Sequence, residues 1–169
     1  VAASFGTSTT ITDPATQGIL VGTSTGNVSF GNATISDATD AISLQNNSAG
    51  TRSFGTITVT NGSGDSFLHG VGGGTTTVSG LATLTNPASN CIDIQDSTTA
   101  VAFANVNCTQ SAAAGVFLDD NSGNVTFADL DGPVTLDDAI RVRGMPVYGH
   151  LLYDALGNLV SSTYTQTGS

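Results

Sequence analysis

The sequence contains no lysine, no glutamate and no tryptophan, and its only arginines are Arg52, Arg141 and Arg143. All thirteen acidic residues are aspartate, which gives a formal net charge of −10 at pH 7. Nucleic acids and anionic membrane surfaces are bound by clustered Lys and Arg, so this composition excludes both as expected partners. The sequence also lacks an apolar run of the roughly 18 residues that a membrane-spanning helix needs, so we expect no membrane insertion.

Helix-forming residues are scarce as well, because Glu and Lys are missing and Met occurs once. Thr, Ser, Asn, Gly and Val are abundant instead, and these residues favour strands and tight turns. A chain of 169 residues suits one domain with one core. The composition therefore predicts a single all-β domain.

A phenylalanine, once replaced by valine, recurs every 24 or 25 residues. The row consists of Phe5, Phe30, Phe54, Val78, Phe103 and Phe127. A fixed period in this range marks a repeat array. Two further rows keep the same period: Thr9, Ala33, Ile57, Ala82, Val106 and Leu130, then Ile11, Ile35, Val59, Leu84 and Cys108.

Each repeat contains a strand around the phenylalanine and a second short strand with its own alternation, such as Ile92-x-Ile94. In the third repeat the pattern leaves open whether Phe67 or Leu68 points inward. A repeat of about 24 residues is too short for a propeller blade and has no segment for the helix of a leucine-rich repeat. One turn of a parallel β-helix fits, with equivalent strands about 4.8 Å apart and like residues stacked on like.

Residues 1–143 resemble the right-handed parallel β-helix repeats of bacterial surface and adhesin-type proteins. The resemblance lies in units such as Val28-Ser29-Phe30-Gly31-Asn32-Ala33-Thr34-Ile35 and Val101-Ala102-Phe103-Ala104-Asn105-Val106-Asn107-Cys108. The predicted fold is a right-handed parallel β-helix of about six coils of 24 residues. Its apolar ladders are expected to include Phe30, Phe54, Phe103, Phe127, Ile35, Val59, Ile92, Val116 and Ile140.

Cysteine is limited to Cys91 and Cys108, whose spacing fits no metal site. The two residues fall in successive repeats but at different positions of the repeat. Two packed free thiols are therefore the favoured interpretation, and a disulfide is the alternative.

The period ends near Gly144, and residues 144–169 hold the three tyrosines, Tyr148, Tyr153 and Tyr164. Residues 153–160 read as a strand, a Gly-Asn turn and a second strand. The open end of a β-helix recruits other chains, so we expect this β-hairpin to be a cap, or else a joint with the tyrosines at the interface. No comparable cap precedes the first coil, which favours an array that continues there by covalent chain or by assembly.

Polysaccharide hydrolases are the catalytic alternative. The inverting pectin hydrolases resemble this fold and carry paired aspartates, a His-Gly pair and a basic triplet, and this chain contains Asp119-Asp120, His69-Gly70 and Arg141-Val142-Arg143. Here, however, the histidine precedes the aspartates, and coils of about 24 residues leave little with which to build a sheltered cleft. We therefore expect no catalytic residues, with His69 in a turn or partly buried.

Aspartates on adjacent coils form the candidate cation site. Asp96 and Asp120 should lie on neighbouring coils with Asp119 beside them, and Asp129 and Asp131 flank Leu130. Carboxylates about 5 Å apart repel one another unless a cation or a shared proton lies between them, so calcium is the candidate ligand. Solvated Asp and Asn ladders at the turns are the favoured interpretation, and no cofactor is required.

These features predict a non-enzymatic structural β-solenoid, secreted or exposed at the cell surface: an adhesin passenger segment or the subunit of a surface fibre. Its expected partners are copies of itself joined end to end, or neighbouring domains, together with a glycan or another cell-surface ligand. The alternatives are a carbohydrate-active β-helix enzyme and a glycan- or calcium-binding module.

Overall fold

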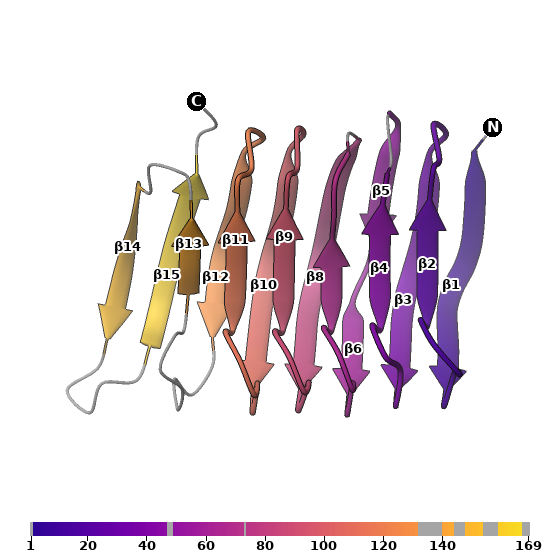
Figure 1. Cartoon of the computed structure of the whole chain (residues 1–169), viewed down its shortest axis with the longest axis horizontal. Helices are drawn as coiled ribbons and strands as arrows, with labels where there is room; N and C mark the ends of the chain where they lie inside the picture. Colours follow the sequence, from indigo (N-terminus) through magenta and orange to yellow (C-terminus); the bar gives the residue numbers. More distant parts are fainter. Residues whose placement is uncertain are drawn as a thin grey trace.

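The computed structural model describes residues 2–46, 49–72, 74–131, 140–143, 148–153 and 159–166. Within these residues the chain is all-β, and its strands stack in coils of about 24 residues (Figure 1). The coils form a parallel β-solenoid of about five turns, which confirms the predicted fold class.

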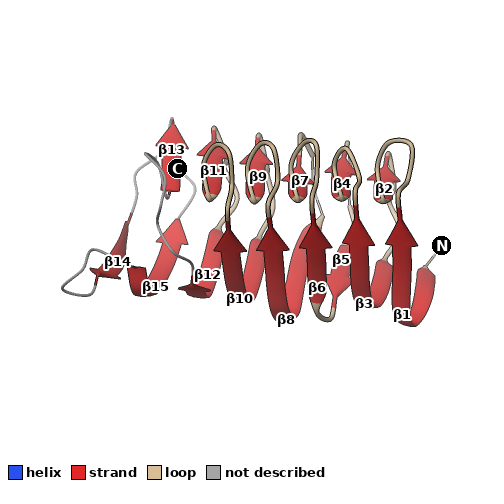
Figure 2. Ribbon diagram, turned by 90° about the horizontal axis from the view of Figure 1, so that it is seen from below, coloured by secondary structure: helices blue, strands red, loops and turns tan. Residues whose placement is uncertain are grey.

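Two sheets face each other across the core (Figure 2). The first, sheet A, contains in spatial order β1 (Ala3–Thr12), β3 (Val28–Ser36), β5 (Thr51–Phe54) with β6 (Ile57–Thr60), β8 (Thr75–Thr85), β10 (Val101–Thr109), β12 (Val125–Asp131), β15 (Leu159–Gln166) and β14 (Tyr148–Tyr153). The second, sheet B, contains β13 (Ile140–Arg143), β11 (Val116–Asp119), β9 (Ile92–Gln95), β7 (Phe67–His69), β4 (Ile42–Gln45) and β2 (Ile19–Gly22). Each coil contributes one strand or strand pair to each sheet.

The register of the strands is the one that the sequence period predicts. Phe5 pairs with Phe30, Phe54 with Val78, and Phe103 with both Val78 and Phe127. The row from Thr9 to Leu130 is paired at every step. Residues of each row therefore stack at the spacing of the coils, and they fill an interior that no single coil could bury.

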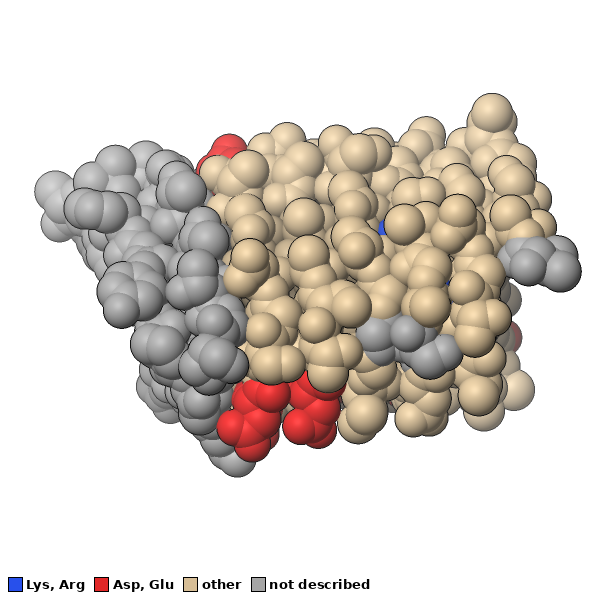
Figure 3. Space-filling view, turned by 90° about the horizontal axis from the view of Figure 1, so that it is seen from above, with Lys and Arg blue, Asp and Glu red and all other residues tan. Residues whose placement is uncertain are grey.

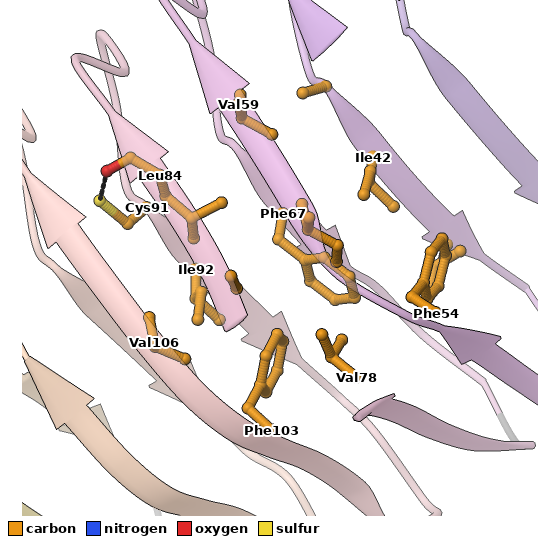
Figure 4. Packing of buried hydrophobic residues seen from close by; sticks show 14 of the residues in the cluster. Ile42, Phe54, Val59, Phe67, Val78, Leu84, Cys91, Ile92, Phe103 and Val106 are labelled. Carbon is orange, nitrogen blue, oxygen red and sulfur yellow. Dashed lines mark hydrogen bonds between the residues drawn. The ribbon is translucent and has the colours of Figure 1, made fainter. Parts of the chain in front are cut away.

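The valine in the phenylalanine row is explained by the opposite sheet. Phe67 of β7 is fully buried and lies edge-on between Phe54 and Phe103, with ring centroids 6.1 Å and 5.1 Å away (Figure 4). Val78 pairs in register with both Phe54 and Phe103, so the smaller side chain stands at the level where the Phe67 ring packs between those two rings. The aromatic ladder thus passes once to sheet B, and Phe67 rather than Leu68 is the inward residue of the third coil.

Polar residues bend the chain at the corners of the coils. Among the described residues, nine that are not glycine have positive φ. They fall in two periodic sets: Asp13, Asp37, Asn61, Asn86 and Gln110 after the strands of sheet A, and Thr23, Asn46, Asp96 and Asp120 after those of sheet B. The left-handed conformation is most accessible to Asn, Asp and Gly. Seven of these nine residues are Asp or Asn, so the backbone geometry of the corners explains why Asp and Asn recur there.

The structure contradicts the expectation of two free thiols, because Cys91 and Cys108 form a disulfide with a Cα–Cα distance of 6.0 Å. Cys108 pairs in register with Leu84, and the Cys91 sulfur lies 3.7 Å from the Leu84 carbonyl oxygen across the turn (Figure 4). The two cysteine rows therefore face each other across one corner, one coil apart. Cys91 follows Leu84 by seven residues, and Cys108 is the residue one coil after Leu84. The two cysteines are therefore 17 residues apart rather than a full repeat of about 24.

The C-terminal strands change the direction of pairing. β15 runs antiparallel to β12, and β14 runs antiparallel to β15, so the expected hairpin extends sheet A beyond the parallel coils. Sheet B ends, within the described residues, at β13. The two sheets thus end at different levels at this end of the solenoid.

Candidate functional site

The outer face of sheet B carries the most unusual carboxylate of the described residues. Asp93 lies between the inward-facing Ile92 and Ile94, so its side chain is on the outer face, yet it is only 5% exposed. Its register partners on the flanking coils are Leu68 and Phe117. A carboxylate on a sheet surface is thus enclosed by larger neighbours.

Two amides hold Asp93 in place. Gln95 Nε2 donates to both carboxylate oxygens, at 2.8 and 3.0 Å, and Asn90 Nδ2 donates to Oδ2 at 3.2 Å. Burial raises the pKa of Asp93 to about 6, and the nearby charges of Asp65 and Asp119 act in the same direction against these hydrogen bonds. The amide N–H groups of Gln95 and Asn90 are therefore engaged by Asp93 itself.

The same brace occurs two coils earlier without a carboxylate. Gln45 Nε2 donates to Ser43 Oγ at 2.8 Å, at the positions that Gln95 and Asp93 occupy in their coil. The arrangement is therefore a repeated structural element of sheet B rather than a feature built once around a substrate.

A ladder of Asp and Asn side chains precedes the strands of sheet B, as the sequence indicated. Asp40 accepts the backbone N–H of Asp65 (3.2 Å), Asp65 accepts that of Asn90 (2.8 Å), and Asn90 Oδ1 accepts that of Ala114 (3.0 Å). Each side chain thus supplements the backbone ladder to the next coil. These residues fix the coil-to-coil spacing at the corner.

The aspartates proposed for calcium occupy two different parts of the fold. Asp96 and Asp120 lie at equivalent corners with φ of 51° and 46°, and the N–H of Asp96 donates to the Asp119 carbonyl oxygen at 3.0 Å. Asp129 and Asp131 belong to β12, in register with Asn105 and Asn107, and the Asp131 side chain lies outside the described residues. The two groups are on different strands and share no site.

Among the residues that the structure describes, no three His, Cys or Asp side chains come together in a metal-binding group. Figure 3 shows acidic side chains gathered at one edge of the molecule, on neighbouring coils. Calcium binding by Asp96, Asp119 and Asp120 stays a prediction, and the corner geometry gives two of them a structural reason to be aspartate.

His69 was expected in a turn or partly buried, but it lies in strand β7, inside the core. It is 3% exposed and pairs in register with Leu44 and Ile94, two inward residues. Burial above all, together with the positive charge of Arg52, lowers the pKa of His69 to about 4, against hydrogen bonds to the backbone that raise it. His69 is therefore a neutral core residue at physiological pH.

Arg52 is the second polar residue that the sequence did not place in the interior. It is 1% exposed, and its guanidinium donates to the carbonyl oxygens of Ala49 (2.9 Å) and Gly26 (3.2 Å) through one nitrogen and of Ser24 (2.7 Å) through the other. These carbonyls belong to the corners of two successive coils. Arg52 therefore ties the corner turns together, and burial lowers its pKa.

The set of residues that resembles the pectin hydrolases does not come together. His69 points into the core, whereas Asp119 is on the outer side of β11 and Asp120 is at the following corner. The side chains of Arg141 and Arg143 lie outside the described residues. A histidine and an aspartate on opposite sides of a sheet cannot act on one bond.

The three tyrosines are on the antiparallel strands of the C-terminal end. Tyr148 and Tyr153 belong to β14 and Tyr164 to β15, where Tyr164 pairs with Phe127 and with Gly149. Their side chains lie outside the described residues, so their role at an interface stays a prediction.

Comparisons with known proteins bring no neighbour: no family model, no curated protein and no solved structure matches the chain. Among the described residues there is no helix long and apolar enough to cross a membrane.

Proposed function

We propose that the chain is a non-enzymatic structural β-solenoid of the extracellular space or the cell surface, either the passenger segment of an adhesin or the subunit of a surface fibre. The observation that supports this proposal most is the use of the polar residues. Among the described residues, many Asp and Asn side chains occupy corners or bond to the next coil, and Arg52 and His69 lie in the core.

The disulfide supports the extracellular part of the proposal. Disulfides persist in oxidising compartments and are rare in the cytosol of most organisms. The Cys91–Cys108 bond joins two adjacent coils at a corner, where it holds the stack together.

Electron microscopy of the purified chain tests the fibre version. A fibre subunit should form filaments along the solenoid axis, with an axial repeat close to the length of the eight levels of sheet A, or about 38 Å at about 4.8 Å each. Particles that never lengthen beyond one or two chains, at any salt or protein concentration, would refute the fibre version and leave the adhesin segment.

A further inference from the structure

Polar residues interrupt the apolar interior at one corner of the solenoid. This is the corner at which each strand of sheet B ends and the chain turns into the next strand of sheet A (Figure 1). Five pairs of inward residues flank this corner, one pair in each turn: Val21 and Val28, Leu44 and Arg52, His69 and Thr76, Ile94 and Val101, Leu118 and Val125. The outer pairs of the series are apolar, and its three polar residues lie together in the middle.

Each of these three residues has one buried polar atom without a hydrogen-bond partner. The atoms are Nε of Arg52, Nδ1 of His69 and Oγ1 of Thr76, and their side chains are at most 3% exposed. Among the described residues, Ser66 Oγ is the one other buried side-chain atom in this condition. Buried polar groups in native proteins are nearly always satisfied by protein, by ordered water or by a bound ion. Three such atoms at one corner therefore indicate a bound ligand.

The three residues come from neighbouring strands. Arg52 of β5 and Thr76 of β8 are register partners, so their Cα atoms stand about 4.8 Å apart on adjacent coils. His69 is the last residue of β7, and Thr76 follows after the turn as the second residue of β8. The charge of Arg52 also acts on the His69 ring. The three side chains therefore form one cluster inside the corner.

Arg52 gives this cluster a positive charge that its protein partners do not neutralise. The guanidinium donates to three backbone carbonyl oxygens, which carry no formal charge. Burial is the only cause that shifts its pKa, so no carboxylate of the described residues acts on it. A buried charge is costly unless a group of opposite charge accompanies it. The cluster therefore favours a negatively charged ligand.

The donors of the cluster decide which anion fits. The Nε–H of Arg52 can only donate, the Thr76 hydroxyl can donate, and the neutral ring of His69 donates from Nδ1 in one of its two tautomers. A metal cation would be repelled by Arg52. A polyatomic anion such as sulfate would have to fit between coils that are about 4.8 Å apart, so a monatomic anion fits best.

We propose that Arg52, His69 and Thr76 form an internal halide site that holds one chloride ion between two successive coils. The Nε–H of Arg52 and the hydroxyl of Thr76 donate to the ion, and the Nδ1–H of His69 is the third donor. The ion neutralises Arg52 and joins the two coils at their corner. Four buried apolar residues adjoin the site along the two rows: Val28, Leu44, Ile94 and Val101.

Urea unfolding of the full chain in different anions tests the proposal. A ligand that binds only the folded state raises stability with the logarithm of its concentration once the site begins to fill. The urea midpoint should therefore rise as chloride replaces gluconate at constant ionic strength, which keeps the screening of the net charge of −10 unchanged. A midpoint that does not respond to this exchange would overturn the proposal.

Two valine variants separate the site from the surface. Thr76→Val removes the inward hydroxyl, and it should weaken the apparent chloride affinity at least about tenfold because a hydrogen bond to a charged group is lost. Thr77→Val makes the same change at the next residue, on the exposed side of β8, and should keep the chloride response of the original chain. Circular dichroism establishes that each variant is folded. A folded Thr76→Val chain with an unchanged chloride response would refute the site.

A crystal structure of the chain refolded from urea in bromide locates the ion directly, and it needs no variant to fold. We expect an anomalous scattering peak within hydrogen-bond distance of Arg52 Nε and Thr76 Oγ1. Ordered water at this position without an anomalous signal would show that the cluster binds water and would overturn the halide site. The result is independent of the proposed function, because the site lies inside the coils and touches neither outer face.

Discussion

The stability of the solenoid should depend on how completely each phenylalanine of the aromatic ladder is enclosed. Phe103 is 1% exposed and contacts Phe67 and Phe127, with ring centroids 5.1 and 5.3 Å away. Truncation of such a ring removes its burial and leaves a cavity, so Phe103→Ala should lower the free energy of unfolding by about 3–5 kcal/mol. Phe5 belongs to the same row but is 48% exposed and has one ring neighbour, so Phe5→Ala should cost about 1 kcal/mol.

Equilibrium urea unfolding of the two variants and the original chain measures this difference. Both variants lose the same atoms, so each serves as the control for the other. Equal losses, or a larger loss for Phe5→Ala, would show that burial in the ladder does not determine the stability of the coils.

Three further predictions concern the buried polar groups and the disulfide. The pKa of Asp93 is raised by burial from 3.8 to about 6, so the folded chain holds this proton more tightly than the unfolded chain and stability falls as the pH rises between these values. Asp93→Asn should abolish that fall and stabilise the protein at neutral pH by at most about 3 kcal/mol, as seen in urea midpoints against pH; an unchanged pH profile would contradict the burial of the charge. The pKa of His69 is lowered from 6.5 to about 4, so the unfolded chain binds this proton more tightly than the folded chain. The stability that the neutral imidazole contributes is therefore complete above pH 6.5 and is lost as the pH falls towards 4. His69→Leu should remove this acid-dependent loss from the melting temperature, and a profile like that of the original chain would count against a buried imidazole. Reduction of the Cys91–Cys108 bond, which closes a loop of 17 residues, should lower stability by about 3 kcal/mol, whereas the double Cys→Ser variant should not respond to reductant.

The repeat, the register and the inward rows were predictable from the sequence because they follow from two periods. The period of about 24 residues gives the repeat and the register, and the period of two within each strand gives the inward rows. The row from Thr9 to Leu130 is paired in the structure as its spacing predicted. The hairpin at the C-terminal end followed in the same way from its Gly-Asn turn, and the structure shows its antiparallel pairing.

Contacts between rows were not predictable in this way, because they depend on how the two sheets face each other. The disulfide joins two rows across a corner, and Phe67 fills the space beside Val78 from the opposite sheet. Arg52 and His69 occupy inward positions of strands, where a charged or titratable residue contradicts the usual alternation. The alternation of Ile92, Asp93 and Ile94 did place Asp93 on the outer face, but nothing in the sequence showed that Leu68 and Phe117 would enclose it.

The disulfide also affects how the chain responds to mechanical load. When a solenoid is pulled from its ends, its coils peel away one after another and each released residue adds about 3.5 Å of contour length. The bond between Cys91 and Cys108 bridges two adjacent coils, so the 17-residue segment that it closes cannot be drawn out. About 60 Å of extension is withheld as long as the bond is oxidised. The redox state of one corner therefore changes the maximum extension of the chain under tension, whatever the thermodynamic stability of its coils.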